Sequence, residues 1–206
     1  MKEKPHVLLV HGIFNSGRCF YKMNLLLEKQ GYVVHSPTLR PNLGLAGLAE
    51  LSSKTKEYID QHIPGGTQIH CVGYSMGGII LRHLLQTESG VLSRTLSFTT
   101  LASPHKGSLH AWLAPLPGWV DMRQSSEFLN NLEKGDHLIV NRIKPLSLWT
   151  PLDLVILPQN SSVWSIAQNE KHLVSMHPNM IRNKNVLARV TRHIDESEQL
   201  QKRQAA

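Results

Sequence analysis

A serine between two glycines is the clearest chemical signal in this sequence. Residues 73–77 (GYSMG) fit the pattern G-x-S-x-G, follow the apolar run 68–72 and precede the helical pattern GIILRHLL. In this strand-turn-helix context a tight turn lifts the serine hydroxyl above the sheet, and glycines avoid clashes with neighbouring elements. We therefore predict that Ser75 is a nucleophile that attacks a carbonyl carbon.

Two backbone N–H groups could complete a site for acyl transfer. This chemistry needs donors aimed at the oxyanion, one from the residue after the nucleophile and one from the loop after an earlier strand. Met76 follows Ser75, and His11-Gly12-Ile13 follows the first apolar run. We predict that Met76 and Ile13 supply these donors; the alternative is a plain glycine turn in which His11 caps local backbone.

An acid should follow the serine along the chain, and a histidine should follow the acid. Asp121 and Asp136 fall where the strand and helix pattern breaks down. Asp153 comes shortly after the apolar run 146–149, where a loop would leave the carboxyl end of a strand. We predict Asp153 as the acid, with a turn or helix-capping aspartate as the alternative.

The candidate base is a histidine near the end of the chain. His177 follows the strand-like run 173–176 and precedes the last helical pattern, so its imidazole could reach the serine. His172 enters the same run from the opposite end, and His193 is expected on the surface of the last helix. His105, in SPHKGS, is interpreted as a structural residue that holds its loop.

Apolar runs alternate with amphipathic stretches, which places these candidates at strand ends. Unbroken apolar runs suit parallel strands covered on both faces, and the order favours right-handed crossovers. We predict a doubly wound α/β fold whose mostly parallel sheet has about six strands and carries its site at their carboxyl ends. The predicted strands are 7–10, 32–34, 68–72, 95–101, 146–149 and 173–176, and the predicted helices are 20–30, 48–63, 127–132 and 186–194.

A single domain is expected over residues 1–206, with an insertion at about 105–136 over the site and a frayed tail at about 196–206. The insertion contains LHAWLAPLPGWV, in which two prolines disfavour a continuous helix. Either this apolar segment packs as core, or it lines an acyl-chain site or touches a lipid surface. We predict substrate binding by Trp112, Trp119 and Phe14.

Composition and charge exclude several classes of protein. Hydrophobic residues make up 41% and charged residues 18%, which does not fit disordered, collagen-like or coiled-coil chains. The formal net charge is +7, but the basic residues are scattered. Their modest concentration near the C-terminus lacks interleaved aromatics, so we expect no nucleic-acid partner. A solvated helix face explains it, with transient contact to an anionic lipid surface as the second interpretation.

The two cysteines, Cys19 and Cys71, form neither a zinc spacing nor a disulfide framework. The apolar stretch near the N-terminus is too short for a secretory signal, and no run of 18 apolar residues occurs. We therefore expect a cytoplasmic protein without a membrane span, a metal or a cofactor.

Together these motifs resemble the α/β-hydrolase family, more narrowly the small lipases and esterases related to inositol-deacylase-like lipases. The resemblance spans about residues 5–195 and rests on VLLVHGIF, HCVGYSMGG, TLASPHKGS, MRQSSEFLNNL and DLVILP. It implies a minimal form of that fold with a short insertion, and a triad of Ser75, Asp153 and His177. Ala102 departs from the family pattern, which usually has glycine there.

The resemblance implies a serine hydrolase that cleaves an acyl lipid or another apolar ester through an acyl-enzyme. An acyltransferase or thioesterase would use the same triad. A hydrolase-like fold that only binds its ligand is the alternative outside enzymes. The choice of acyl chain and acceptor depends on the shape of the site, and the oligomeric state is left open.

Overall fold

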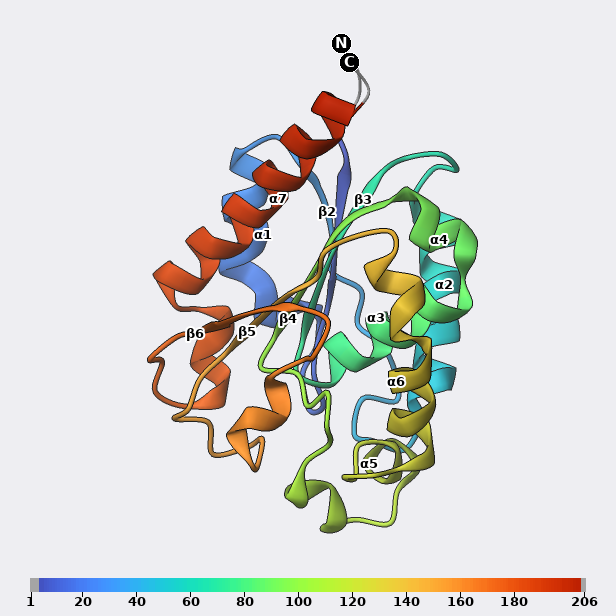
Figure 1. The fold of residues 1–206 in the computed structure, drawn as a ribbon, viewed down its shortest axis with the longest axis vertical. Coiled ribbons are helices and arrows are strands. Elements are labelled where there is room, and N and C mark those ends of the chain that lie inside the picture. Colours follow the sequence, from blue (N-terminus) through green and yellow to red (C-terminus); the bar gives the residue numbers. More distant parts are fainter. Residues whose placement is uncertain (1–3, 205–206) are drawn as a thin grey trace.

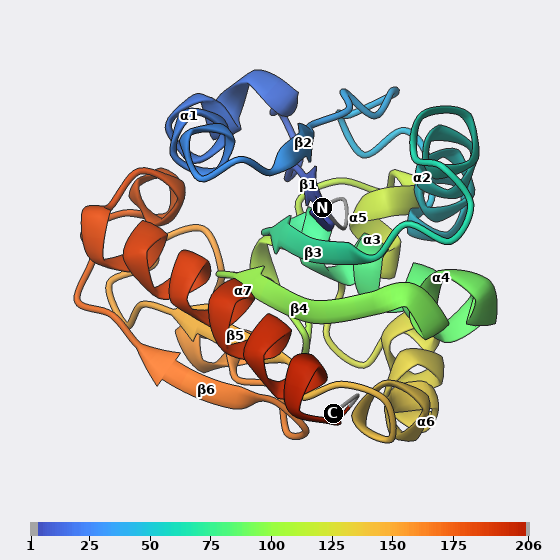
Figure 2. The same cartoon turned by 90° about the horizontal axis from the view of Figure 1, so that it is seen from above.

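The computed structural model describes residues 4–204 and contains one six-stranded, all-parallel sheet with the strand order β2-β1-β3-β4-β5-β6. Helices cover both of its faces (Figures 1 and 2). The predicted α/β fold with a parallel sheet of six strands is thus confirmed. The strands are β1 (His6–Val10), β2 (Val33–His35), β3 (Ile69–Tyr74), β4 (Thr95–Leu101), β5 (Leu146–Trp149) and β6 (Gln168–Lys171).

Two helical layers bury the apolar faces of the sheet. In β1, Val7 and Leu9 pack with one layer, whereas Leu8 and Val10 pack with the other, because side chains alternate along a strand. The first layer holds α1 (Tyr21–Lys29) and α7 (Lys184–Gln204), and the second holds α2 (Leu48–His62), α3 (Met76–Thr87) and α6 (Glu127–Val140). Within residues 4–204 no helix is both long and apolar enough to cross a membrane. Shorter elements are η1 (Gly17–Phe20), α4 (Ser89–Arg94), η2 (Leu109–Trp112), α5 (Pro117–Asp121), η3 (Gln159–Ser162) and η4 (His177–Ile181).

The sixth strand lies earlier in the chain than the sequence predicts. β6 pairs with β5 from Leu146↔Gln168 to Trp149↔Lys171. The predicted strand 173–176 is instead a loop, in which Leu173 is exposed. β6 forms the edge of the sheet and its QNEK side chains are largely exposed, so it carries no apolar pattern.

The segment that interrupts the strand-helix alternation is shorter than the predicted insertion of residues 105–136. α6 begins at Glu127 and buries Leu129, Leu132 and Ile139 in the core, so it is the crossover helix between β4 and β5. The part before α6, with η2 and α5, lies beyond the carboxyl ends of the strands, at the lower end of Figure 1.

The tail that was predicted to fray from about residue 196 is helical. α7 continues to Gln204, and the Tyr32 hydroxyl lies 2.7 Å from a Glu198 carboxylate oxygen, which accepts its hydrogen bond. His193, expected on the helix surface, is only 8% exposed and forms a 2.8 Å hydrogen bond with Thr99. The apolar side of α7 packs on the sheet, and this packing holds the helix in place. Residues 205–206 lie outside the described residues.

Candidate active site

Ser75 occupies a strained turn between β3 and α3. Its backbone has φ 53° and ψ −126°, a conformation that costs a residue other than glycine about 1–3 kcal/mol. The Ser75 N–H donates a 2.8 Å hydrogen bond to the carbonyl of Leu101 at the end of β4. This bond ties the turn to the sheet, in the strand-turn-helix arrangement that the GYSMG pattern predicts.

Glycines allow neighbouring backbone segments to approach Ser75. A Cβ on Gly77 would lie 2.0 Å from the carbonyl oxygen of Val10, and a Cβ on Gly73 would lie 2.4 Å from the backbone of α3. A Cβ on Gly12 would lie 2.8 Å from the Ser75 Cβ. The loop after β1 and the start of α3 therefore meet at the serine because these side chains are absent.

Asp153 and His177 form a buried, hydrogen-bonded pair. His177 Nδ1 donates to Asp153 Oδ2 at 2.7 Å, and the residues are 5% and 1% exposed. The other carboxylate oxygen accepts hydrogen bonds from the N–H groups of Val155 and Ile156 at 2.8 and 2.9 Å. The carboxylate is thereby fixed, and it holds the His177 proton on Nδ1 and leaves a lone pair on Nε2.

The His177 imidazole packs beside the serine turn. Tyr74, the residue before Ser75, places its ring centroid 4.9 Å from that of His177. His177 opens η4 after Met176, whose φ of 67° marks a sharp change of chain direction. Sequence reasoning did not single out Tyr74, and its place inside the GYSMG pattern is the signal that could have found it.

The two other aspartates considered for the acid have separate partners. Asp121 accepts a 2.7 Å hydrogen bond from the N–H of Leu48 at the start of α2. Asp136 forms a buried ion pair with Arg82, whose Nε and Nη2 each donate to a carboxylate oxygen at 2.8 Å. Among the described residues neither carboxylate is hydrogen-bonded to a histidine, so the geometry favours Asp153.

His105 and His172, two of the other histidines near the end of a predicted strand, also have different surroundings. His105 Nε2 lies 3.0 Å from the Thr100 hydroxyl, and its ring stacks on Trp164 with centroids 4.4 Å apart. Burial, followed by the nearby cations, lowers the pKa of His105 well below its usual value, which supports a structural role. His172 Nε2 lies 3.9 Å from a carboxylate oxygen of Glu170 in β6.

The loop after β1 is held by a neutral histidine. The Leu39 N–H donates to His11 Nε2 at 3.0 Å, so the ring proton lies on Nδ1 and is donated to the Gly12 carbonyl at 2.8 Å. Burial lowers the pKa of His11, which keeps this arrangement uncharged. Ile13 follows Gly12 in this loop. Met76 is the first residue of α3, and the first N–H groups of a helix have no intrahelical partners.

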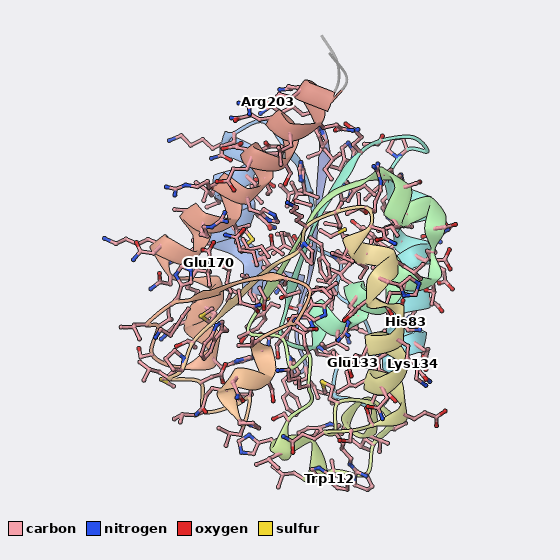
Figure 3. All side chains as sticks on the ribbon, in the orientation of Figure 1. His83, Trp112, Glu133, Lys134, Glu170 and Arg203 are labelled. Atoms are coloured by element: carbon pink, nitrogen blue, oxygen red, sulfur yellow. The ribbon has the colours of Figure 1, made fainter. Side chains whose placement is uncertain are left out.

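Apolar side chains stand around this end of the sheet. Phe14 is 62% exposed and meets Trp119 edge to face at 5.8 Å between ring centroids. Trp119 Nε1 donates a 3.1 Å hydrogen bond to the Leu43 carbonyl. Trp112 lies at the lower end of Figure 3, with the Arg123 guanidinium 4.4 Å from its ring centroid. The structure thus brings two of the three predicted substrate-binding residues into contact.

The family model described as "Alpha/beta hydrolase family" matches residues 7–167. The chain is similar to pyrethroid hydrolase of Sphingobium wenxiniae, with 26% identity over 125 residues that cover 51% of this chain and 44% of that protein. An Arabidopsis thaliana protein named as a methylesterase is 28% identical over 100 residues, which cover 46% of this chain and 26% of the relative. The matched segments thus span less than half of either relative.

Two solved lipase structures share the architecture. The mature form of Bacillus licheniformis lipase BlEst2 superposes with a TM-score of 0.70 at 18% identity, covering 88% of both chains. Aspergillus fumigatus lipase B superposes with a TM-score of 0.74 at 17% identity, covering 90% of this chain and 51% of that one. At these identities the likeness concerns the fold.

Proposed function

Because the chain belongs to the alpha/beta hydrolase family, we propose that it hydrolyses carboxylic esters through an acyl-enzyme on Ser75. The proposal is carried by the buried 2.7 Å hydrogen bond between His177 and Asp153, formed beside the strained serine turn. A relative named as a pyrethroid hydrolase and structural neighbours named as lipases support ester chemistry.

In the first half of the reaction His177 Nε2 takes the Ser75 proton while the serine oxygen attacks the ester carbonyl carbon. The N–H groups of Ile13 and Met76 stabilise the negative charge on the carbonyl oxygen, and Asp153 stabilises the imidazolium. The carbon–oxygen bond to the alcohol then breaks, and the alcohol oxygen takes the proton from His177. Water attacks the acyl-enzyme by the same steps and releases the acid.

The substrate we propose is an acyl lipid or another apolar ester. The exposed side chains of Phe14 and Trp112, together with Trp119, provide apolar surface in loops beyond the carboxyl ends of the strands, the end of the sheet at which Ser75 follows β3. Each methylene buried there contributes up to about 0.8 kcal/mol, so the rate constant should rise with acyl length until the apolar surface is filled.

Ser75→Ala tests the nucleophile. We expect kcat/KM for p-nitrophenyl esters to fall by about 10⁴ to 10⁶ and labelling by a fluorophosphonate to disappear, with an unchanged circular dichroism spectrum. Ser53→Ala, a change at an exposed serine in α2, is the matched control and should retain both signals. A Ser75→Ala protein that keeps wild-type turnover and still takes up the probe would refute the assignment.

A series of p-nitrophenyl esters from acetyl to octanoyl tests the substrate class. We expect longer chains to react faster, and expect Trp119→Ala and Trp112→Ala to reduce this preference more than they reduce acetyl hydrolysis. Tyr21→Ala is the control, because Tyr21 is a 66% exposed aromatic residue on α1. Equal rates on acetyl and octanoyl esters, unchanged in both tryptophan variants, would leave an esterase for small or polar esters.

We also infer that the protein works in the cytoplasm, where thiols stay reduced. Cys19 and Cys71 are free, and burial raises the pKa of both thiols to about 12, so neither is a reactive thiolate. Cell fractionation checks this location, and recovery of the protein outside the cytoplasmic fraction would contradict it.

A further inference from the structure

Exposed apolar side chains gather in the loops beyond the carboxyl ends of the strands. Leu113 is 75% exposed and Leu154 is 68% exposed, values that a residue serving the core would not show. Figure 3 places Trp112, next to Leu113, at the end of the molecule opposite Arg203. We call the exposed residues Phe14, Leu43, Trp112, Leu113, Leu154 and Val155 the apolar face.

Hydrogen bonds join the loops that carry the apolar face into one surface. The Leu109 N–H donates to the Leu157 carbonyl at 2.8 Å, and His110 Nδ1 donates to the Val155 carbonyl at 2.9 Å. These bonds connect the loop after β4 to the loop after β5. Trp119 connects the loop after β4 to the loops after β2 and β1 through Leu43 and Phe14. These contacts therefore hold the loops of the apolar face together.

Cations outnumber carboxylates in the loops that carry the apolar face. The described loops after β1, β2, β4, β5 and β6 contain two carboxylates, Asp121 and Asp153, and both are hydrogen-bonded within the protein. The same loops carry the exposed cations Arg40 and Lys106, and Arg123 lies over Trp112. An apolar surface on loops that also carry exposed cations suits a partner that is apolar inside and anionic at its surface.

We propose that the apolar face docks on an anionic lipid surface and so presents Ser75 to esters held in that surface. Leucine and aromatic side chains gain free energy when they leave water for the acyl region, while arginine and lysine attract anionic headgroups. The delivery of an ester rests on the proposed function, whereas the docking step itself needs no catalytic group.

Docking is measured first with the Ser75→Ala protein, which binds without turnover. It should sediment with vesicles of phosphatidylcholine and phosphatidylglycerol, and less with phosphatidylcholine alone. Adding Leu113→Gln and Leu154→Gln should lower the partition coefficient at least about ten-fold, because two leucines no longer enter the acyl region. Leu25→Gln with Leu200→Gln is the matched control, since these leucines are 50% and 56% exposed on α1 and α7.

The same substitutions in the active protein separate docking from chemistry. Leu113→Gln with Leu154→Gln should hydrolyse a soluble short-chain ester within about two-fold of wild type, as is usual for surface changes, and lose hydrolysis of an ester embedded in vesicles. Equal vesicle binding by the double variant and its parent would overturn the docking proposal. So would a dimer in sedimentation velocity that the double variant abolishes, because the face would then bind a second copy. Intact vesicle binding without any ester hydrolysis would refute the proposed function and leave docking standing.

Discussion

At the scale of single residues, the partners of the ring nitrogens distinguish the histidines of this chain. His177 bonds a carboxylate, His105 bonds the hydroxyl of Thr100, and His11 bonds backbone groups through both nitrogens. A carboxylate stabilises the imidazolium that forms when a histidine accepts a proton, whereas a hydroxyl or a backbone group gives it much less stabilisation. His172 also faces a carboxylate, but its Nε2 lies 3.9 Å from Glu170, whereas His177 Nδ1 lies 2.7 Å from Asp153. Among the candidate histidines we therefore propose His177 as the base.

Parallel replacement of three histidines by glutamine tests this distinction. His177→Gln should lower kcat/KM by about 10⁴, because glutamine cannot take the serine proton. His172→Gln should keep near wild-type activity, and His105→Gln should keep a measurable rate while unfolding at a lower temperature, since it loses its stacking on Trp164. Ester hydrolysis and thermal melts measure both effects. An inactive His172→Gln beside an active His177→Gln would reverse the assignment.

At the scale of elements, the sequence predicted five of the six strands, including the edge strand β2, and missed the other edge strand, β6. A central parallel strand such as β3 is covered on both faces and must be apolar throughout, which gives a readable run. β6 has one neighbour and exposed side chains, so burial leaves no mark on its sequence. The conformation of Ala102 was not predictable either. It has φ 48°, which explains why the family pattern usually has glycine there, and an alanine in the sequence does not indicate a positive φ.

Some parts of the candidate site could likewise be predicted from the sequence, and others could not. Ser75 and the glycines around it are predictable because the turn dictates local residue types. The choice among three aspartates was not fixed by local pattern, because it depends on partners distant in the chain. Asp136 forms an ion pair with Arg82, and nothing in the sequence near either residue indicates this pair.

Glycine substitutions test how closely the elements at the serine turn are packed. Gly77→Ala should destabilise the fold by several kcal/mol and abolish activity, because its Cβ would overlap the Val10 carbonyl at the end of β1. Gly90→Ala in α4 is the matched control, since its Cβ would meet nothing within 4 Å, and it should stabilise by about 0.5–1 kcal/mol. Urea unfolding measures both changes. Equal stability of the two variants would contradict the close approach of β1 and α3.

At the scale of the whole molecule, neutral histidines in the interior make stability depend on pH. Burial, followed by the charge of Arg189, lowers the pKa of His193 from 6.5 to about 4. The unfolded chain therefore binds this proton more readily than the folded protein does. The contribution of neutral His193 to stability is fully present above pH 6.5 and is lost as the pH falls towards 4.

The free energy of unfolding should consequently fall by about 2–3 kcal/mol through His193 between pH 7 and pH 4.5. Buried His11 and His105 act in the same direction, because burial lowers the pKa of each. Glu198, whose pKa is lowered to about 2 mainly by the nearby His70 imidazole, loses its contribution only below its usual value of 4.5. Urea titrations across this range measure the slope. His193→Gln should flatten the slope, and an unchanged slope would contradict the prediction.

Ser75 lies in the first half of the chain, whereas Asp153 and His177 follow β5 and β6. A ribosome builds the protein from its N-terminus, so the nucleophile is synthesised well before its acid and its base. A growing chain in which β1 to β4 have already paired carries the serine turn but has neither of these partners for it. Under the proposed mechanism, ester cleavage begins only when the last edge strand joins the sheet, so unfinished chains leave the esters around them intact.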